Sequence, residues 1–194
     1  MNVNWDKIFE TYPTIETERC ILRQITMKDA SVLFKMMSDE HIIRYLGRLP
    51  MVSMDEAVER VVTYIKGFEE QQNVTWMICS RDSGEVMGLC TVFNLSKAHY
   101  RAELGYILLS SWWRQGIMTE VIPVVLKWGF EVMQLHSFMA NIDPANEASR
   151  RLLEKDGFVQ EAYFREDFYH PVYQKFTDTV IFSLIKPDWQ ARNE

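Results

Sequence analysis

The sequence predicts a mixed α/β domain, with a central sheet of about six or seven strands flanked by about four helices. Three observations support this prediction. Two N-terminal segments carry apolar residues at helical spacing, three strand-like runs follow in succession, and the second half contains two strand–helix–strand passages. Such passages form right-handed crossovers, so the sheet is expected to be mixed. The 194 residues, 47% hydrophobic and 25% charged, have the size and composition of one globular domain over residues 1–194.

The N-terminal part is expected to alternate helix and strand. Residues 1–15 form an extension that carries a short helix, and residues 19–25 form the first strand. Thr26 can cap the next helix, whose apolar residues recur with a period of 3.6 residues. Ser53 and Glu56 then form a capping box at the start of a second helix.

A three-strand meander is expected in the middle of the chain. Asp82, Ser83 and Gly84 lie between two apolar runs, which is a hairpin signal. The expected strands cover residues 75–80, 86–93 and 103–109.

The second half is expected to contain two more helices and three more strands. The first helix is expected from residue 121 to about residue 133, and Pro123 inside it would clash with the Thr119 carbonyl unless the helix bends or begins late. Asn146 can cap the second helix, which ends at Gly157. The expected strands cover residues 137–142, 158–165 and 179–185. An aromatic and charged loop over residues 164–171 is expected between the last two strands.

Composition excludes several classes of protein. A formal net charge of −6 argues against general nucleic-acid binding, which needs a basic surface. The three cysteines form no C-x-x-C pair and are expected to be reduced thiols in the core. No signal peptide and no membrane-spanning run is visible, so we expect a cytoplasmic protein without a membrane partner. The four histidines lack metal-ligand spacing, and no metal site is predicted.

The most informative segment is residues 112–120, which joins a strand to a helix. It contains Arg114, Gln115 and Gly116 just before the helix begins. The first backbone N–H groups of a helix have no internal partner, and the helix dipole adds positive potential there. Because a glycine lets the backbone approach an anion closely, the segment is predicted to bind phosphate.

These residues resemble those of the GNAT superfamily of N-acetyltransferases, and within it the RimJ/RimL-like branch that acetylates ribosomal-protein N-termini. The similarity runs from residue 16 to residue 189. It is carried by five segments in the family's order, namely residues 16–23, 102–108, 113–120, 146–158 and 178–184. Met118 departs from the pattern, since the family usually has a small residue there, and Pro123 is also unusual.

The resemblance implies acetyl-CoA as the acetyl donor and a primary amine as the acceptor. The amine attacks the thioester directly, with no covalent enzyme intermediate. The resemblance also implies the groups that hold the donor. The pyrophosphate would be bound by the backbone amides of Arg114, Gln115, Gly116, Ile117, Met118 and Thr119. The thioester oxygen would be polarised by a backbone N–H among Ile107, Leu108 and Leu109.

Two glutamates are candidates for the general base. Glu103 lies in an apolar strand, on the same face as Gly105 and Ile107, where reduced solvation suits a base. The alternative is a glutamate in water or paired with Arg101. Glu161 stands where many relatives carry a glutamate, and the alternative is a solvated strand residue.

The start of the last helix supplies further candidates. Matching relatives place Ser149 near the sulfur of coenzyme A as proton donor, and Asn146 at the pantetheine arm or the acceptor. The alternative is that Asn146 only caps the helix and Ser149 is only a packed small residue. Tyr106 and Tyr163 are further candidates, although an aromatic residue in a strand usually belongs to the core.

Three functions remain open from the sequence. The first is acetylation of a protein N-terminus, and the second is acetylation of a small amine such as an antibiotic or polyamine. The third is a non-catalytic acyl-CoA-binding module, because a fold does not fix a function. Residues 36–52 and 164–176 are expected to wall the acceptor site, with selectivity in residues 164–171. An edge strand near the C-terminus would allow a homodimer.

Overall fold

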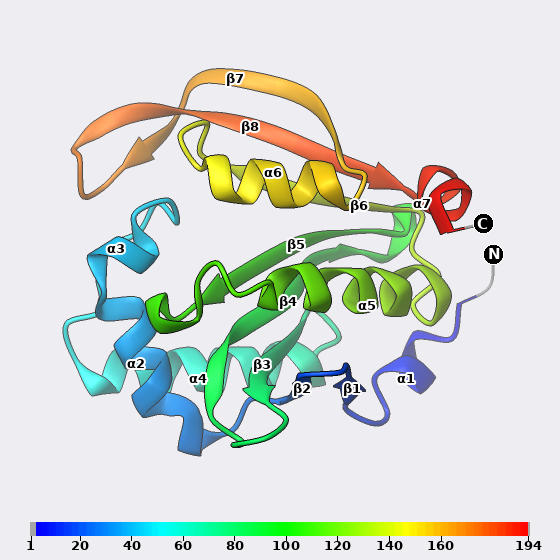
Figure 1. The fold of residues 1–194 in the computed structure, drawn as a ribbon, viewed down its shortest axis with the longest axis horizontal. Helices are drawn as coiled ribbons and strands as arrows, with labels where there is room; N and C mark the ends of the chain where they lie inside the picture. Colours follow the sequence, from blue (N-terminus) through cyan, green and yellow to red (C-terminus); the bar gives the residue numbers. More distant parts are fainter. Residues whose placement is uncertain (1–2, 194) are drawn as a thin grey trace.

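A computed structural model of the protein describes residues 3–193. Within these residues the centre is one sheet of eight strands, in the order β1-β2-β3-β4-β5-β6-β8-β7 (Figure 1). The strands are β1 (Ile15–Glu16), β2 (Cys20–Gln24), β3 (Val74–Ser80), β4 (Val86–Ser96), β5 (Arg101–Leu108), β6 (Ser137–Ile142), β7 (Val159–His170) and β8 (Lys175–Ile185). Neighbouring strands are antiparallel except for β5 and β6, which are parallel. The mixed sheet is confirmed, and the additional strand is the two-residue β1.

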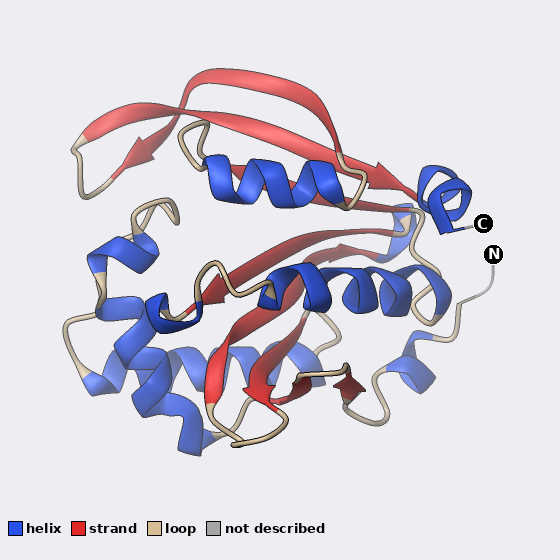
Figure 2. Ribbon diagram, in the orientation of Figure 1, coloured by secondary structure: helices blue, strands red, loops and turns tan. Residues whose placement is uncertain are grey.

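Helices cover both faces of this sheet (Figure 2). Those in the described residues are α1 (Trp5–Ile8), α2 (Ala30–Ser38), α3 (Glu40–Ile43), α4 (Met54–Glu69), α5 (Ile117–Glu131), α6 (Glu147–Lys155) and α7 (Lys186–Asn193). The alternation along β3 shows the two layers. Trp76 and Ile78 lie in the core beneath α5, whereas Met77 and Cys79 lie in the core beneath α2 and α4. The four predicted helices are α2, α4, α5 and α6, and the short α1 was also expected.

The helix α5 keeps its proline in the interior. It begins at Ile117, so it does not begin late, and Pro123 lies inside it. Proline has no N–H to donate to the Thr119 carbonyl, so one helical hydrogen bond is missing at this point. Extensive burial of the helix compensates, because Val121, Ile122 and Val125 are all inaccessible to solvent.

The last hairpin differs from the prediction. Residues 164–170 are not a loop but the continuation of β7, which pairs with β8 as far as His170 and Lys175. A β-bulge interrupts the pairing between Phe164 and Phe168, and Glu166 in the bulge has a φ of 50°. Exposed charged and aromatic residues suggested a loop. They form a strand because backbone pairing with β8 stabilises a solvent-exposed ribbon whatever its side chains.

The strands β5 and β6 pair over only part of their length. Their register covers three pairs, the last being Glu103 with Met139, while β5 continues to Leu108 and β6 to Ile142. The sheet thus divides into β1–β5 and β6, β8 and β7, which diverge beyond Glu103 (Figure 2). Residues 104–108 of β5 have no strand partner on the β6 side, so their polar backbone groups on that side are available to a ligand.

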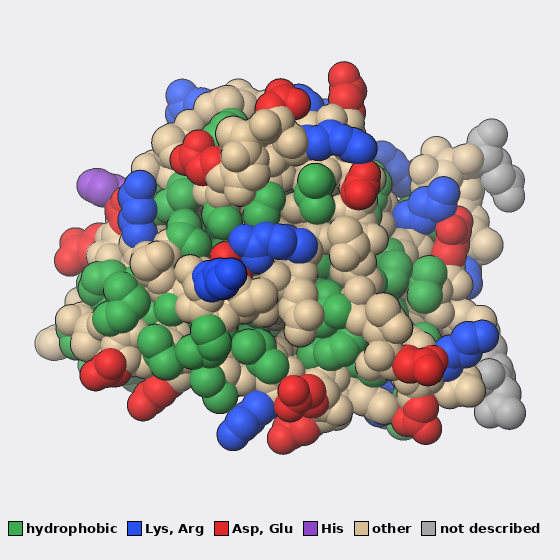
Figure 3. All heavy atoms as spheres, turned by 90° about the horizontal axis from the view of Figure 1, so that it is seen from below, with side chains coloured by type: hydrophobic (Ala, Val, Ile, Leu, Met, Phe, Trp, Pro, Cys, Tyr) green, Lys and Arg blue, Asp and Glu red, His purple; other side chains and the backbone are tan. Residues whose placement is uncertain are grey.

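The surface carries no dominant charge of one sign on the face seen in Figure 3, where basic and acidic side chains are interspersed. Across residues 3–193, no helix combines the length and apolar character needed to cross a lipid bilayer. All three cysteines are free and buried, as expected.

Candidate active site

The loop before α5 presents its backbone to solvent. Arg114 and Gly116 have φ angles of 59° and 77°, both in the left-handed region, and Gly116 is the N-cap residue of α5. The side chains of Ile117 and Met118 are 3% and 7% exposed and belong to the core. Met118 therefore points away from the loop surface, and its size does not obstruct the backbone N–H groups.

These backbone N–H groups are available for an anion. Within residues 3–193, none of the N–H groups of residues 114–119 donates a hydrogen bond, and the first to do so is that of Glu120, to Gly116 O at 3.2 Å. A ligand phosphate can satisfy them, and the dipole of the 15-residue α5 favours negative charge there. The loop therefore fits the pyrophosphate of a coenzyme A molecule.

An ion pair that the sequence analysis missed holds this loop in place. Arg19 Nε donates to Glu120 Oε2 at 2.6 Å, and Arg19 Nη1 donates to Gln115 O at 2.9 Å. The Thr17 hydroxyl and the Arg19 N–H both donate to Glu120 Oε1. Burial opposes ionisation of Glu120, but these hydrogen bonds outweigh it and lower the pKa of the carboxyl. Both residues lay in segments already singled out, but nothing in the sequence indicated that they pair.

A contact between two hydroxyl groups joins β5 to α6 on the α5 and α6 side of the sheet. The Asn146 Oδ1 caps α6 by accepting a hydrogen bond from Ser149 N at 3.1 Å. The hydroxyls of Ser149 and Tyr106 are 2.6 Å apart, and Ser149 is buried. Burial raises the pKa of Tyr106, although the hydrogen bond with Ser149 opposes it. The structure thus brings two hydroxyl groups together where β5 and β6 diverge.

The carboxylate of Glu103 lies at the point of divergence. Its Oε1 accepts a hydrogen bond from Asn94 Nδ2 at 2.9 Å, and its Oε2 accepts one from Asn141 Nδ2 at 3.2 Å. Glu103 is half-buried and lies on the face that Gly105 and Ile107 share, as predicted. It is not paired with Arg101. Two amides from β4 and β6 orient it instead.

The second candidate base, Glu161, lies elsewhere. It is exposed at a β-bulge of β7, where it accepts a hydrogen bond from the Ser183 hydroxyl at 2.7 Å. β6 and β8 separate β7 from β5 in the sheet, which places the two strands about 14 Å apart at ordinary strand spacing. The structure does not bring Glu161 and Glu103 together.

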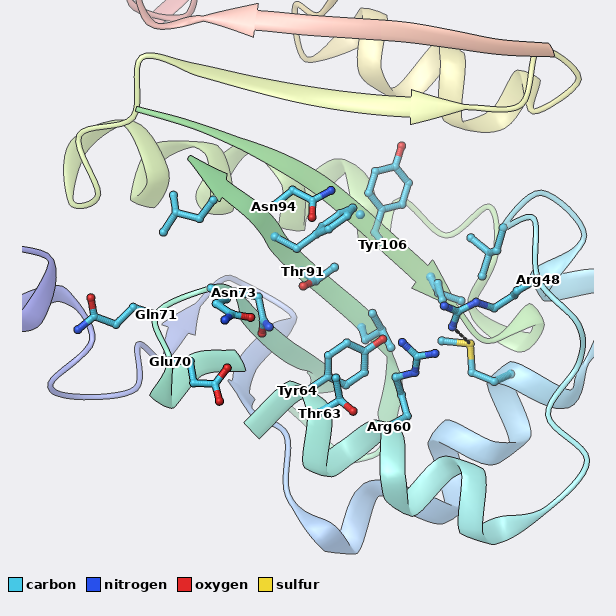
Figure 4. Close-up of a pocket in the computed structure, with 18 of the residues that line it drawn as sticks. Arg48, Arg60, Thr63, Tyr64, Glu70, Gln71, Asn73, Thr91, Asn94 and Tyr106 are labelled. Carbon is cyan, nitrogen blue, oxygen red and sulfur yellow. Dashed lines mark hydrogen bonds between the residues drawn. The ribbon is translucent and has the colours of Figure 1, made fainter. Parts of the chain in front are cut away.

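A cleft of 720 Å³ opens on the α2 and α4 side of β4 and β5 (Figure 4). Gly105 and Ile107 belong to its floor, and side chains of α4 and of residues 70–73 form the opposite wall. Met37, Leu46 and Arg48 contribute as expected for residues 36–52, whereas no residue of 164–176 lines the cleft. Part of that segment, including His170, lines a smaller hollow beside α3 instead. Sequence analysis gave no signal for the contribution of α4.

Metal ligation is not apparent in the described residues. Over residues 3–193, no group of three or more histidine, cysteine, aspartate or glutamate side chains is arranged to hold an ion.

Comparison with known proteins identifies the class. The family model described as "Acetyltransferase (GNAT) domain" matches residues 19–159. The chain is 37% identical to the uncharacterized N-acetyltransferase YoaA of Bacillus subtilis over 178 residues, 91% of this chain and 98% of that protein. The chain belongs to the GNAT acetyltransferases. It is thus an acetyl-CoA-dependent N-acetyltransferase.

Two further proteins that resemble this chain have different acceptors in their names. Over 109 residues, 56% of this chain and 55% of that protein, the chain is 29% identical to the [ribosomal protein uS5]-alanine N-acetyltransferase of Escherichia coli. Its fold matches the spermidine N-acetyltransferase of Vibrio cholerae in complex with CoA and spermine, with a TM-score of 0.79 and 20% identity. That match covers 89% of this chain and 98% of the other. The acceptor is therefore not fixed by similarity.

Proposed function

We propose that this enzyme acetylates the N-terminal amine of a protein or peptide, with the acceptor bound in the 720 Å³ cleft. The observation that carries this choice is the charge of the cleft. Its lining contains one acidic side chain, Glu70, against three basic ones, Arg48, Arg60 and Lys97, among the described residues. A polyamine carries several positive charges and needs carboxylates around it, which this cleft does not supply.

The polar lining suits a peptide. Gln72, Asn73 and Thr91 present amides and a hydroxyl along the cleft, and such groups can form hydrogen bonds with a peptide backbone. The cleft volume of 720 Å³ also lies within the range typical of ligand-binding pockets. The relative that modifies alanine of ribosomal protein uS5 supports the same choice of acceptor.

We propose the following roles in transfer. The amides of residues 114–119 bind the donor's pyrophosphate, and the backbone N–H of Ile107 or Leu108 donates to the thioester oxygen as negative charge develops there. The Leu109 N–H, the third candidate, already donates to Met87 O at 2.9 Å. Asn146 caps α6 and contacts the pantetheine arm. These groups hold the donor along the part of β5 that has no β6 partner.

We assign the two proton transfers of the reaction to residues on opposite faces of β5. Glu103 accepts the proton that the attacking amine loses, directly or through one water molecule. When the carbon–sulfur bond breaks, the Ser149 hydroxyl donates a proton to the leaving thiolate, and Tyr106 replaces that proton through the 2.6 Å contact. Glu161 remains a second candidate for the base, although its place on β7 makes it the weaker one. Family membership favours this enzymatic function over a non-catalytic acyl-CoA-binding module.

Two further expectations from the sequence stand beside this proposal. A small amine such as an antibiotic or polyamine is the alternative acceptor, and it is favoured only by the similarity to a spermidine acetyltransferase. The homodimer stays a prediction, for which the edge strand β7 offers exposed backbone and side chains.

A screen of amine acceptors tests the proposal. Purified protein is mixed with acetyl-CoA and with short peptides, polyamines or aminoglycosides, and free thiol release is followed. We expect kcat/KM for at least one free-N-terminus peptide to exceed that for spermidine. N-terminally blocked versions of the same peptides are the control. Preferred acetylation of polyamines or aminoglycosides would show that the proposed acceptor is wrong.

A further inference from the structure

One end of the cleft holds two arginine side chains. Arg60 lies on α4, one turn before Tyr64, so both side chains lie on the same side of the helix. Arg48 comes from the segment that follows α3. Figure 4 shows both guanidinium groups directed into the space between α4 and the sheet, with Glu70 and Gln71 at the other end.

Neither arginine has an acidic partner. Among residues 3–193, no carboxylate lies within ion-pair distance of Arg48 or Arg60, and the contact that Arg48 makes is with Met37 Sδ at 3.9 Å. Glu56 and Glu59 line the adjacent hollow together with both arginines but form no ion pair with them. The two arginines thus face the cleft uncompensated.

Two other arginines of the protein have the carboxylate partner that Arg48 and Arg60 lack. Arg23 binds Asp29 at 2.7 Å, and Arg19 binds Glu120 at 2.6 Å. Each of these two arginines is matched with a carboxylate, which offsets the cost of desolvating a charge. Arg48 and Arg60, both half-buried at the cleft, have no such carboxylate within residues 3–193.

Without a carboxylate partner, the charges of Arg48 and Arg60 are electrostatically unfavourable in the absence of a ligand. Burial, and then the positive charge of Arg60, lower the pKa of Arg48. Arginine nevertheless remains protonated in proteins, so the two charges repel each other until an anion lies between them. A carboxylate fits, because a guanidinium binds it with two parallel hydrogen bonds.

We propose that Arg48 and Arg60 bind a carboxylate of the acceptor, so that the substrate is a primary amine with an acidic group close to that amine. This inference rests on the proposed function, in which the cleft holds the acceptor. The amine lies over Gly105 and Ile107 on the floor, and the carboxylate lies at the arginine end. The acidic group can be an aspartate or glutamate side chain next to a peptide N-terminus, or the α-carboxylate of a free amino acid.

Matched peptides test the inference. Three short peptides carry Glu, Gln or Lys at the second position and are otherwise identical, and free glutamate is the fourth acceptor. We expect kcat/KM for the Glu peptide to exceed that for the Gln peptide by about tenfold or more, with the Lys peptide lowest. Preference for free glutamate over the Glu peptide would identify the α-carboxylate as the bound group, and would overturn the peptide as the acceptor while the carboxylate inference stands.

Substitutions then locate the effect. We expect Arg60→Gln and Arg48→Gln each to lower kcat/KM for the Glu peptide by about tenfold, mainly through KM, and to leave the Gln peptide nearly unchanged. Arg60→Lys keeps the charge and should retain part of the preference. Arg44→Gln removes the same charge from an exposed residue outside the cleft lining, and should leave the Glu-to-Gln ratio at its wild-type value.

The outcomes separate the two proposals. Equal rates with the Glu and Gln peptides, or equal losses on both peptides in the arginine variants, would overturn the carboxylate inference while peptide acetylation stands. Preferred use of the Lys peptide would overturn it as well. Failure to acetylate any peptide or amino acid, with acetylation of polyamines, would overturn the proposed function together with this inference.

Discussion

The two sides of β5 present contrasting binding sites. On the proposed donor side, the pyrophosphate site is one continuous segment, residues 114–119, whose binding groups are backbone N–H groups. The proposed acceptor side is built from α2, the segment after α3, α4, β4 and β5, and its binding groups are side chains. Phosphate binding by the backbone depends on local conformation, whereas acceptor binding depends on which distant side chains the fold brings together.

The same contrast appears in the arginines. On the donor side, Arg19 is neutralised by Glu120 and supports the loop from outside, through Gln115 O. On the acceptor side, Arg48 and Arg60 have no carboxylate partner within residues 3–193. A paired arginine stabilises the fold, and an unpaired one in a cleft is free to select a ligand. Each of the following changes tests one side of this comparison.

Substitution Gly116→Asp should have the largest effect. It places a negative charge beside the free amides of the donor loop, and we expect acetyl-CoA affinity to fall by about a hundredfold or more, measured by calorimetry. An added Cβ meets only Arg19 Nη2 at 3.5 Å, so the loss would not come from a steric clash. Gly84→Asp makes the same change at another left-handed glycine, on an exposed turn, and serves as the control. Unchanged affinity in Gly116→Asp would refute the phosphate-loop assignment.

Substitution Glu103→Gln should have the next largest effect. A carboxamide cannot accept the amine proton, so we expect kcat to fall by about a hundredfold and the acidic limb of the pH–rate profile to disappear. Glu161→Gln removes the other candidate and should keep the wild-type profile. If only Glu161→Gln changes the profile, the base lies on β7. If neither substitution changes it, neither glutamate is the base.

Substitution Ser149→Ala should have a moderate effect on the donor side. The helix cap remains, because Asn146 bonds to the backbone of residue 149. We expect a fall in kcat of about tenfold with little change in acetyl-CoA affinity, since Tyr106 can supply part of the proton transfer. Ser183→Ala removes a hydroxyl bound to Glu161 and is the matched control. A wild-type kcat in Ser149→Ala would mean that this hydroxyl only packs against Tyr106.

Substitution Asp156→Asn should have the smallest effect, on stability. Burial raises the pKa of Asp156 from 3.8 to about 6, although the charges of Lys155 and Arg192 oppose this, and its Oδ2 has no hydrogen-bond partner in residues 3–193. Because the folded-state pKa is the higher one, the aspartate lowers stability above about pH 6 and has no such cost below about pH 4.

We therefore expect Asp156→Asn to raise the free energy of unfolding at pH 7.5 by about 1–2 kcal/mol, and to have no effect near pH 4. Urea unfolding at the two pH values measures this difference. Asp82→Asn, on an exposed hairpin turn, should change neither value. A gain that is equal at both pH values would show that ionisation of Asp156 is not the cause.

The elements predicted from the sequence are those with strong local signals. Asn146 and Gly157 bound α6 as expected, because caps act within one helical turn. The helix α5 begins earlier than expected, at Ile117 instead of residue 121, and Gly116 is its N-cap. The error was the ribbon of β7, whose polar residues 164–170 carry no local strand signal and are extended only because β8 pairs with them.

The candidate site shows the same difference between residues with a local sequence signal and partners that only the fold brings near. Glu103, Ser149 and Tyr106 were singled out, but the amides of Asn94 and Asn141 that bind Glu103 were not, because they come from other strands. The contact between Ser149 and Tyr106 spans 43 residues of sequence, and that between Arg19 and Glu120 spans 101. No spacing rule reaches across such separations.

By itself, the sequence determined the class of fold and the class of enzyme, and it predicted the donor loop, since short contiguous segments encode them. Only the tertiary structure decided that Glu103 lies between two amides at the divergence of β5 and β6, and that Arg48 and Arg60 meet in one cleft. The physical reason is that backbone conformation depends on neighbouring residues, whereas the meeting of distant side chains depends on the packing of the whole sheet and its helices.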